Sequence, residues 1–205
     1  AIWDEAARYL TARDLEPGEQ EVLLKPTDSG TNGSIYEHCS RAIDRALDRC
    51  GAIGLPLIGC GDWNDGMNRV GVNGKGESVW MGFFLYRILD QFVPVCRGRH
   101  DEQRADRYEQ RCRELQQVLI DVGWDGRWFR RAFYDDGTPL GSADNDECQI
   151  DALVQAWSVI SGAVPRARAE TAMGEALERL VDRDAGLIQL LYPPCDKTAP
   201  HPGTT

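Results

Sequence analysis

The chain has 205 residues, of which 42% are hydrophobic, and its 33 acidic and 23 basic side chains give a net charge of −10. This length and composition suffice for one sizeable hydrophobic core, so we expect a single domain over residues 1–205. The acidic balance, with no basic patch to override it, argues against nucleic acid or an anionic membrane surface as a partner, and no run of about 18 apolar residues indicates direct membrane contact.

Helical signals begin near residue 34. Ser34 and Glu37 have the spacing of a capping box, which predicts the start of a helix, and Gly51 closes it. Residues 79–93 are apolar nearly all round, which is typical of a helix buried between neighbours.

Further helices are predicted in the second half of the chain. Apolar residues recur every three or four positions from 105 to 122 and again from 150 to 157. Pro165 lies in the expected first turn of a helix that runs to residue 180. Strand signals are few and short, and neither a repeat nor a linker divides the chain, so the expected fold class is all-α.

The connection between the first two predicted helices reads CGDWNDGMNRVGVNGKGESVW over residues 60–80. Its glycines indicate backbone that turns sharply or approaches a ligand, and its tryptophans argue against disorder. The spacing fits neither an EF-hand that starts at Asp62 nor a Walker loop that ends at residues 74–75. Two interpretations remain: a structural loop, or a sugar site in which an aromatic ring stacks on a pyranose and carboxylates and amides bind its hydroxyls.

Residues 130–162 have the same character. A turn at residues 137–139 is surrounded by carboxylates, amides and aromatic side chains, among them Asp136, Gln155 and Trp157. Taken singly, these residues are typical of a solvated turn and of a helix core. Two such stretches within one helical domain favour the sugar site.

The cysteines and histidines indicate no metal site. The seven cysteines are widely spaced without a C-x-x-C pair, which predicts reduced and mostly buried thiols. The three histidines lack metal-ligand spacing, and His38 is expected to have a structural role.

The chain resembles the catalytic domain of glycoside hydrolase family ninety-four in five successive segments. That family contains cellobiose, chitobiose and β-1,2-oligoglucan phosphorylases and the C-terminal region of cyclic β-1,2-glucan synthetases. The motif GDWNDGMNRVG followed by GKGESVW is most similar to the synthetase group. The resemblance implies a partial (α/α)6 barrel of the six-hairpin glycosidase type, incomplete at both ends. The segments are YEHCSRAIDRAL, GLPLIGCGDWNDGMNRVGVNGKGESVWMGFFLY, DDGTPLGS, CQIDALVQAWSVISGA and LLYPPCDKTAPHPG.

The family's W-N-D run falls on residues 63–65. By resemblance, Asp65 is the general acid and Trp63 lines the donor-sugar subsite. A carboxyl group that donates a proton at neutral pH needs a raised pKa, which burial or a bound phosphate anion supplies. Asp62 is expected to be a structural or a sugar-binding partner. The full set of candidate substrate-binding residues is Trp63, Asn64, Asp62, Asp136 and Gln155.

The implied reaction is inverting phosphorolysis of a β-linked glucan, with β-1,2-glucan favoured, to α-glucose 1-phosphate. Inorganic phosphate is a co-substrate and no cofactor is expected. One catalytic carboxylate suffices, because phosphate is already an anionic nucleophile. The alternative enzyme, an inverting hydrolase, needs a second carboxylate about 6.5–9.5 Å from the first, for which Asp136 or Glu147 could serve.

Family members continue past the PPxDKT segment to further acceptor and phosphate contacts, and donor-sugar contacts are expected upstream. Since this chain ends at Thr205, it is expected to be the middle portion of a catalytic domain, with the rest of that domain as its partner and negligible activity alone. The parent is either a membrane-associated synthetase or a soluble phosphorylase, and we expect this segment to be cytoplasmic. A non-catalytic carbohydrate-binding piece is the remaining alternative.

Overall fold

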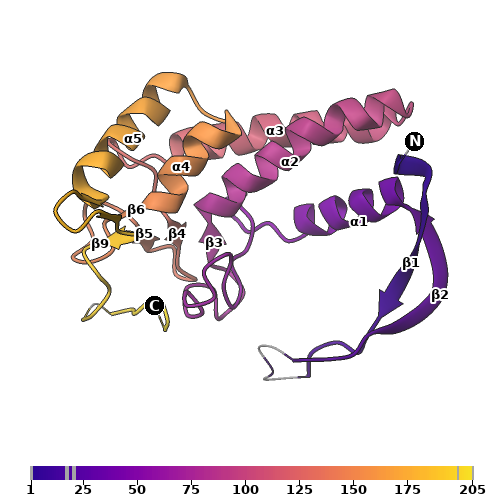
Figure 1. The fold of residues 1–205 in the computed structure, drawn as a ribbon, viewed down its shortest axis with the longest axis horizontal. Helices are drawn as coiled ribbons and strands as arrows, with labels where there is room; N and C mark the ends of the chain where they lie inside the picture. The colour runs from indigo at the N-terminus through magenta and orange to yellow at the C-terminus, as the bar shows by residue number, and fades with distance from the viewer. Residues whose placement is uncertain (1, 17–18, 20–21, 198, 205) are drawn as a thin grey trace. The chain divides into compact units, whose positions relative to one another are not determined.

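The computed structural model describes residues 2–16, 19, 22–197 and 199–204 (Figure 1). These residues form two compact units, residues 1–48 and residues 49–205, and each is described by itself. The expectation of a single domain over the whole chain stays a prediction.

The first unit is a hairpin followed by a helix. Strands β1 (Ala6–Thr11) and β2 (Thr27–Ser34) pair antiparallel after a short 3-10 helix, Ile2–Asp4. Strand β2 reads TDSGTNGS and has no alternation of apolar and polar residues, so its sequence carries no strand signal. The expectation of an all-α chain is therefore wrong for this hairpin.

Helix α1 (Ile35–Leu47) begins where the sequence predicts. The Glu37 backbone N–H donates to Ser34 Oγ at 3.2 Å, and the Ser34 N–H donates to Glu37 Oε2 at 2.7 Å, which confirms the capping box. His38 has a structural role here: its Nε2 lies 3.1 Å from the Ala7 carbonyl oxygen, and its ring stacks on Tyr9.

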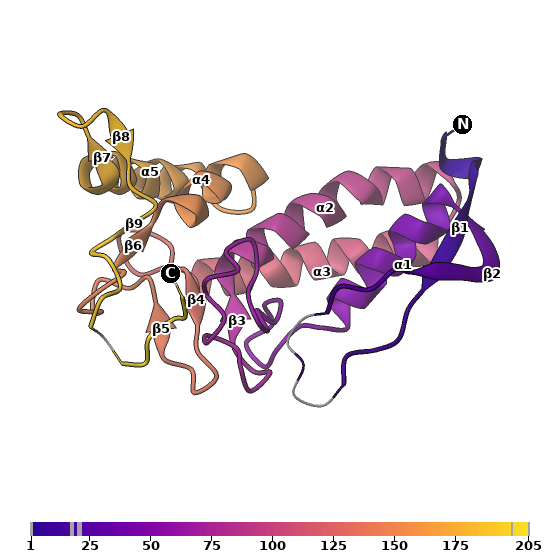
Figure 2. The ribbon, with the colours of Figure 1, turned by 60° about the horizontal axis from the view of Figure 1, so that its bottom comes forward.

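The second unit is built on helices α2 (Val79–Gly98) and α3 (Glu102–Asp121), which lie side by side in both ribbon views (Figure 2). Helix α4 (Ala152–Ser161) packs against α2 and against α5 (Arg166–Leu180). The predicted helices are confirmed, but several of their ends differ from the prediction. Helix α1 ends at Leu47 and not near Gly51, and α4 begins at Ala152, after Ile150. Helix α2 continues through Pro94 beyond the predicted end, and Pro165 is the N-cap of α5 and not part of its first turn.

Short antiparallel pairs join these helices. Because each of these strands has two residues, the alternation of apolar and polar residues that marks a strand cannot be recognised in the sequence. The second unit is therefore mixed and not all-α. Strands β3 (Glu77–Ser78), β4 (Ala132–Phe133) and β5 (Pro139–Leu140) form one sheet in that order, β6 (Ile150–Asp151) pairs with β9 (Leu191–Tyr192), and β7 (Val181–Asp182) pairs with β8 (Leu187–Ile188).

Helix α2 is the core helix of the second unit, as predicted. Among the described residues it is also the one helix long and apolar enough to cross a membrane by length and composition. The sequence shows no unbroken apolar run there because Arg87 and Asp90 interrupt it. Half of the apolar window is buried inside the unit, as in the core helix of a globular domain. Its buried residues are Val79, Gly82, Phe83, Leu85, Leu89, Phe92, Val93 and Cys96.

All seven cysteines are reduced thiols, as predicted. Their expected burial is confirmed only in part. Cys96, Cys112 and Cys148 are buried, Cys39, Cys50 and Cys195 are partly buried, and Cys60 is exposed.

Candidate functional site

The motif loop, residues 60–76, contains neither helix nor strand, as predicted. It leaves and re-enters the body of the unit at one place, because the Ile58 N–H donates to the Gly76 carbonyl oxygen at 2.9 Å. The buried side chains of Met67 and Val70 anchor it in a small apolar cluster with Tyr134 and Cys148. The loop is therefore a packed feature with a defined conformation.

Asp62 is anchored within this loop by a buried ion pair. The Arg131 guanidinium donates from NH2 to Asp62 Oδ1 at 2.6 Å and from NH1 to Asp62 Oδ2 at 2.7 Å, and both side chains have 0% exposure. Ser78 Oγ donates to Asp62 Oδ2 at 2.7 Å. Burial opposes ionisation, but the hydrogen bonds and charge of Arg131 outweigh it and hold the pKa of Asp62 below its usual value. Asp62 is therefore an ionised anchor, with neither a proton nor a free oxygen for a sugar.

Asn64 shapes the turn around Asp65. Its backbone N–H donates to Asp62 Oδ1 at 3.1 Å, and its own side-chain oxygen accepts from the Gly66 N–H at 2.9 Å. In each of these two successive turns, a side-chain oxygen accepts the hydrogen bond that a backbone carbonyl accepts in an ordinary turn, as Asp and Asn side chains commonly do. The backbone on both sides of Asp65 is thereby fixed.

Trp63 and Asp65 are the members of the motif that face solvent. Trp63 is 57% exposed, so more than half of its large apolar side chain is open to solvent. Asp65 is exposed, and within the part of the chain that the structure describes its carboxylate has no hydrogen bond or ion pair. An uncovered ring close to an unoccupied carboxyl group suits a ligand that combines an apolar face with polar atoms, as a pyranose does.

The other two candidates lie in the second stretch. Gln155 is fully buried, and its side chain bonds the Phe129 N–H and carbonyl oxygen, each at 2.9 Å, so the structure gives it a packing role. Asp136 is exposed and accepts from the Thr138 N–H at 2.9 Å in a tight turn. The site residues that the structure brings together are thus those of the motif loop.

The two carboxylate-rich stretches do meet, through a turn residue that was not among the candidate site residues. Asp135 accepts from the backbone N–H groups of Asn73, Lys75 and Gly76 at 2.9, 2.8 and 2.9 Å. Burial raises the pKa of this carboxyl group, but the three donors outweigh it and leave the pKa lowered. The turn after β4 therefore clamps the second half of the motif loop.

Arg131 is the most important residue that sequence reasoning missed. Besides Asp62, its guanidinium lies next to Asp151, with Nε 3.3 Å from Oδ2. Burial raises the pKa of Asp151 against the opposing charge of Arg131, so Asp62 is the principal counter-ion. A signal was present, because Arg131 lies in the run WFRRAF, and a charged residue among apolar ones indicates a buried ion pair.

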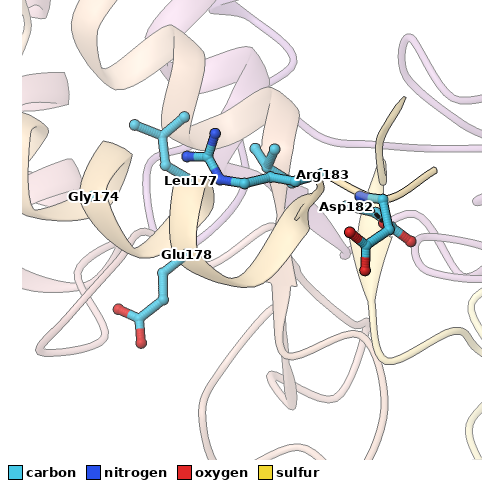
Figure 3. A pocket seen from close by; sticks show the side chains of 7 residues that line it. Gly174, Leu177, Glu178, Asp182 and Arg183 are labelled. Carbon is cyan, nitrogen blue, oxygen red and sulfur yellow. Dashed lines mark hydrogen bonds between the residues drawn. The ribbon is translucent and has the colours of Figure 1, made fainter. Parts of the chain in front are cut away.

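One hollow elsewhere in the second unit lacks the aromatic ring that a sugar site needs. A hollow of about 800 Å³ lies where α5 meets β7 (Figure 3). It is lined by Arg183, by the carboxylates Glu178, Asp182 and Asp184, and by small or aliphatic residues. With no aromatic ring it lacks a stacking platform for a pyranose. Among the described residues, no group of three or more His, Cys, Asp or Glu side chains could hold a metal ion.

Comparison with known proteins shows which family the chain matches. The family model for the glycosyl hydrolase 94 superfamily, catalytic domain, matches residues 6–205. The chain is 45% identical over 202 residues to the cyclic beta-(1,2)-glucan synthase NdvB of Rhizobium meliloti (strain 1021), which covers 98% of this chain and 7% of that protein. It is 34% identical over 156 residues to the 3-O-beta-D-glucopyranosyl-beta-D-glucuronide phosphorylase of Paenibacillus borealis, covering 75% of this chain and 20% of that protein. The chain thus spans a small part of the length of these relatives.

A solved structure shows the same fold at low sequence identity. The family GH78 rhamnosidase of Bacillus sp. GL1 superposes with a TM-score of 0.54 and 17% identity, over 69% of this chain and 14% of that one. That likeness concerns the fold alone, and it agrees with a helical glycosidase architecture. Because the family model covers nearly the whole chain, these residues belong to the catalytic domain of the glycosyl hydrolase 94 superfamily.

Proposed function

We propose that this chain carries the general acid, Asp65, of an inverting glycoside phosphorylase domain that acts on β-1,2-linked glucan within a protein of the cyclic β-1,2-glucan synthase kind. The names of the relatives support this, since one is a cyclic beta-(1,2)-glucan synthase and another a phosphorylase. The substrate would be a β-glucan oligosaccharide, and inorganic phosphate the co-substrate.

The observation that carries the proposal is the contrast between the two aspartates of the motif. Both oxygens of Asp62 are occupied in a buried ion pair that lowers its pKa, so it is ionised at neutral pH. Asp65 is exposed, and Trp63 on the same loop is 57% exposed. Of the two aspartates, Asp65 is therefore the one whose carboxyl group is open to a sugar that stacks on Trp63.

In the proposed reaction, a phosphate oxygen attacks the anomeric carbon from the face opposite the leaving group. The new C–O bond forms as the glycosidic C–O bond breaks, and the released electron pair on the leaving oxygen takes the Asp65 proton. Configuration inverts, so a β-linked glucan gives α-glucose 1-phosphate and a chain shorter by one unit. Asp65 is reprotonated from solvent, which its exposure permits.

A hydrolase would need a second carboxylate free to activate water. Glu147 is poorly suited, because its carboxylate accepts from the backbone N–H groups of Asp196 at 3.0 Å and Lys197 at 2.9 Å. Asp136 already accepts from Thr138 in its own turn. These engagements favour phosphate as the nucleophile.

We also propose that the helices of this chain belong to an (α/α)6 barrel with residues 52–77 at one mouth, and that the domain is cytoplasmic. The likeness to the GH78 rhamnosidase supports the first of these. Further chain segments would then complete the subsites around Trp63 and Asp65.

The test uses the complete protein with β-1,2-glucan, with and without inorganic phosphate, and measures α-glucose 1-phosphate. Asp65→Asn should lower kcat by about 10²–10⁴-fold or more while glucan still binds, because the amide keeps the shape but has no transferable proton. Phosphate-independent release of reducing sugar would instead show a hydrolase. Glucan binding without turnover in the wild type would show a binding domain.

A further inference from the structure

We propose that Arg131 is a positioning residue, which sets the place of Asp65 by joining the motif loop to the N-termini of helices α2 and α4. This inference rests on the proposed function of Asp65. It concerns a residue that is too deeply buried to touch substrate, since the Arg131 side chain has 0% exposure.

One guanidinium contacts three elements. Its NH1 and NH2 hold the two oxygens of Asp62 on the motif loop. NH1 also lies 3.3 Å from Ser78 Oγ, and Nε lies 3.3 Å from Asp151 Oδ2. Ser78 is the N-cap of α2 and Asp151 is the N-cap of α4, so the loop and both helix starts meet at a single cation.

The two helix caps are themselves well anchored. Ser78 Oγ accepts from the Met81 N–H at 3.1 Å, and Asp151 Oδ1 accepts from the Leu153 and Val154 N–H groups at 2.8 and 3.3 Å. These bonds fix the first turn of each helix. Arg131 therefore ties the motif loop to rigid structure on two sides.

The backbone of Arg131 is equally constrained. Its N–H donates to the Leu140 carbonyl oxygen at 2.8 Å, and its carbonyl accepts from the Val79 N–H at 3.2 Å. A Cβ added at Gly141, which has a φ of +83°, would lie 2.5 Å from the Arg131 nitrogen. The backbone that carries the guanidinium, directly before β4, is thus enclosed by its neighbours.

Two hydrogen bonds connect Asp62, which Arg131 holds, to the backbone on either side of Asp65. Asp62 Oδ1, which Arg131 holds, accepts from the Asn64 N–H at 3.1 Å, and the Asn64 side chain accepts from the Gly66 N–H at 2.9 Å. Asp65 lies between these two bonded residues. A shift of Asp62 must therefore move Asp65 or break the turn.

Energetics favour a positioning role over a purely stabilising one. A buried ion pair is offset by the desolvation of both charges, and an apolar pair of similar volume is often as stable. What an apolar pair cannot supply is the bidentate geometry that fixes one carboxylate in distance and direction. Fixing Asp62 in this way is useful if the residue three positions later must meet a glycosidic oxygen.

The test compares four variants of the complete protein, assayed well below their melting temperatures. Arg131→Met leaves the Asp62 carboxylate buried without a cation, so both Tm and kcat should fall. The double variant Asp62→Asn with Arg131→Met removes both members of the ion pair but leaves the buried Asp151 without its cation, so it should regain part of the lost Tm. Its kcat should stay about 10²-fold below wild type with KM for glucan nearly unchanged, because a small misplacement of a reacting group costs about that much. Arg131→Lys should rescue kcat in part, since a lysine cannot hold both oxygens.

The neighbouring Arg130→Met is the matched control. Arg130 is partly buried and paired with Asp125 at 2.6 Å, and it also bonds the Val122 carbonyl oxygen at 2.7 Å, away from the motif loop. The Arg130→Met variant should lower Tm without changing kcat. Wild-type kcat in the double variant, or an equal loss of kcat in Arg130→Met at equal Tm, would overturn the inference.

A second readout does not depend on the reaction. Hydrogen exchange of the peptide that covers residues 60–69 should speed up in the double variant and not in Arg130→Met. If wild-type protein releases no glucose 1-phosphate, the proposed function fails, and this exchange result still decides whether Arg131 holds the loop. Unchanged exchange in the double variant would refute that role.

Discussion

Asp135→Asn should loosen the second half of the motif loop. In the wild type, Asp135 Oδ1 accepts from the Lys75 and Gly76 N–H groups, and Oδ2 accepts from the Asn73 N–H. An asparagine has one oxygen, so its amide nitrogen must face at least one of these donors. At least one hydrogen bond to a charged acceptor is then lost, and such bonds contribute about 1.5–3 kcal/mol.

The partial exposure of Asp135 places the expected loss at the lower end, about 1.5 kcal/mol of local opening free energy. This corresponds to roughly tenfold faster hydrogen exchange in the peptide that covers residues 71–78 of the complete protein. Asp136→Asn is the matched control, because Asp136 is exposed and an amide oxygen can still accept from Thr138. Equal acceleration by the two variants would contradict the assignment of the clamp to Asp135.

The effect of Asp135 should also depend on pH in a defined direction. The pKa of its carboxyl group is lowered in the folded state, because the three backbone donors outweigh burial. Its contribution is therefore fully present above the unfolded value of about 3.9 and is lost as the pH falls through the folded pKa. The difference in exchange between wild type and Asp135→Asn, corrected for intrinsic rates, should be constant from pH 5 to 8 and should shrink below about pH 4. A difference that grows on acidification would refute the reasoning.

Three further predictions concern the motif loop and its supports. Gly203→Ala should disturb the motif loop at residues 66–68 and lower kcat, because an added Cβ would overlap the backbone there. Gly186→Ala, also at positive φ but with open space around it, should leave kcat unchanged. Trp63→Ala should change the free energy of unfolding by less than about 0.5 kcal/mol, because the ring is 57% exposed, but should raise KM for glucan in steady-state assays. Asp62→Asn should lower calorimetric stability by about 3–5 kcal/mol, since it leaves the Arg131 charge buried without its counter-ion; a loss as small as that of Trp63→Ala would argue against the ion pair.

The parts of the fold that local sequence determines were predictable. A capping box needs only Ser34 and Glu37 three positions apart, and the spacing of apolar residues in α3 reflects one buried face of that helix alone. The β1–β2 hairpin was not predictable in this way. Strand β2 consists of small polar residues and glycines, and its pairing with β1 depends on residues about 20 positions away.

The candidate site was predictable as a loop but not as a set of roles. Composition marked residues 60–80, and the family motif marked Asp65, without any knowledge of contacts. The role of Asp62 depends on Arg131, which is 69 positions away in the chain, and no spacing rule links the two. The packing contacts of Gln155 could not be predicted for the same reason, because its partner Phe129 lies 26 positions away in the chain.

The acidity of these loops has a structural cause that bears on which carboxylate does chemistry. A long connection without helix or strand leaves backbone N–H groups that need acceptors, and buried ones cannot remain unpaired. Glu77 accepts from the Ile53 and Leu55 N–H groups at 2.9 and 2.7 Å, and Asp135 meets the same need farther along. Most of the carboxylates that first indicated a sugar site are therefore required by the loop itself. Of the three carboxylates in residues 60–80, Asp65 is the one that satisfies no such group among the described residues, and this is the physical reason to look for its role in the reaction.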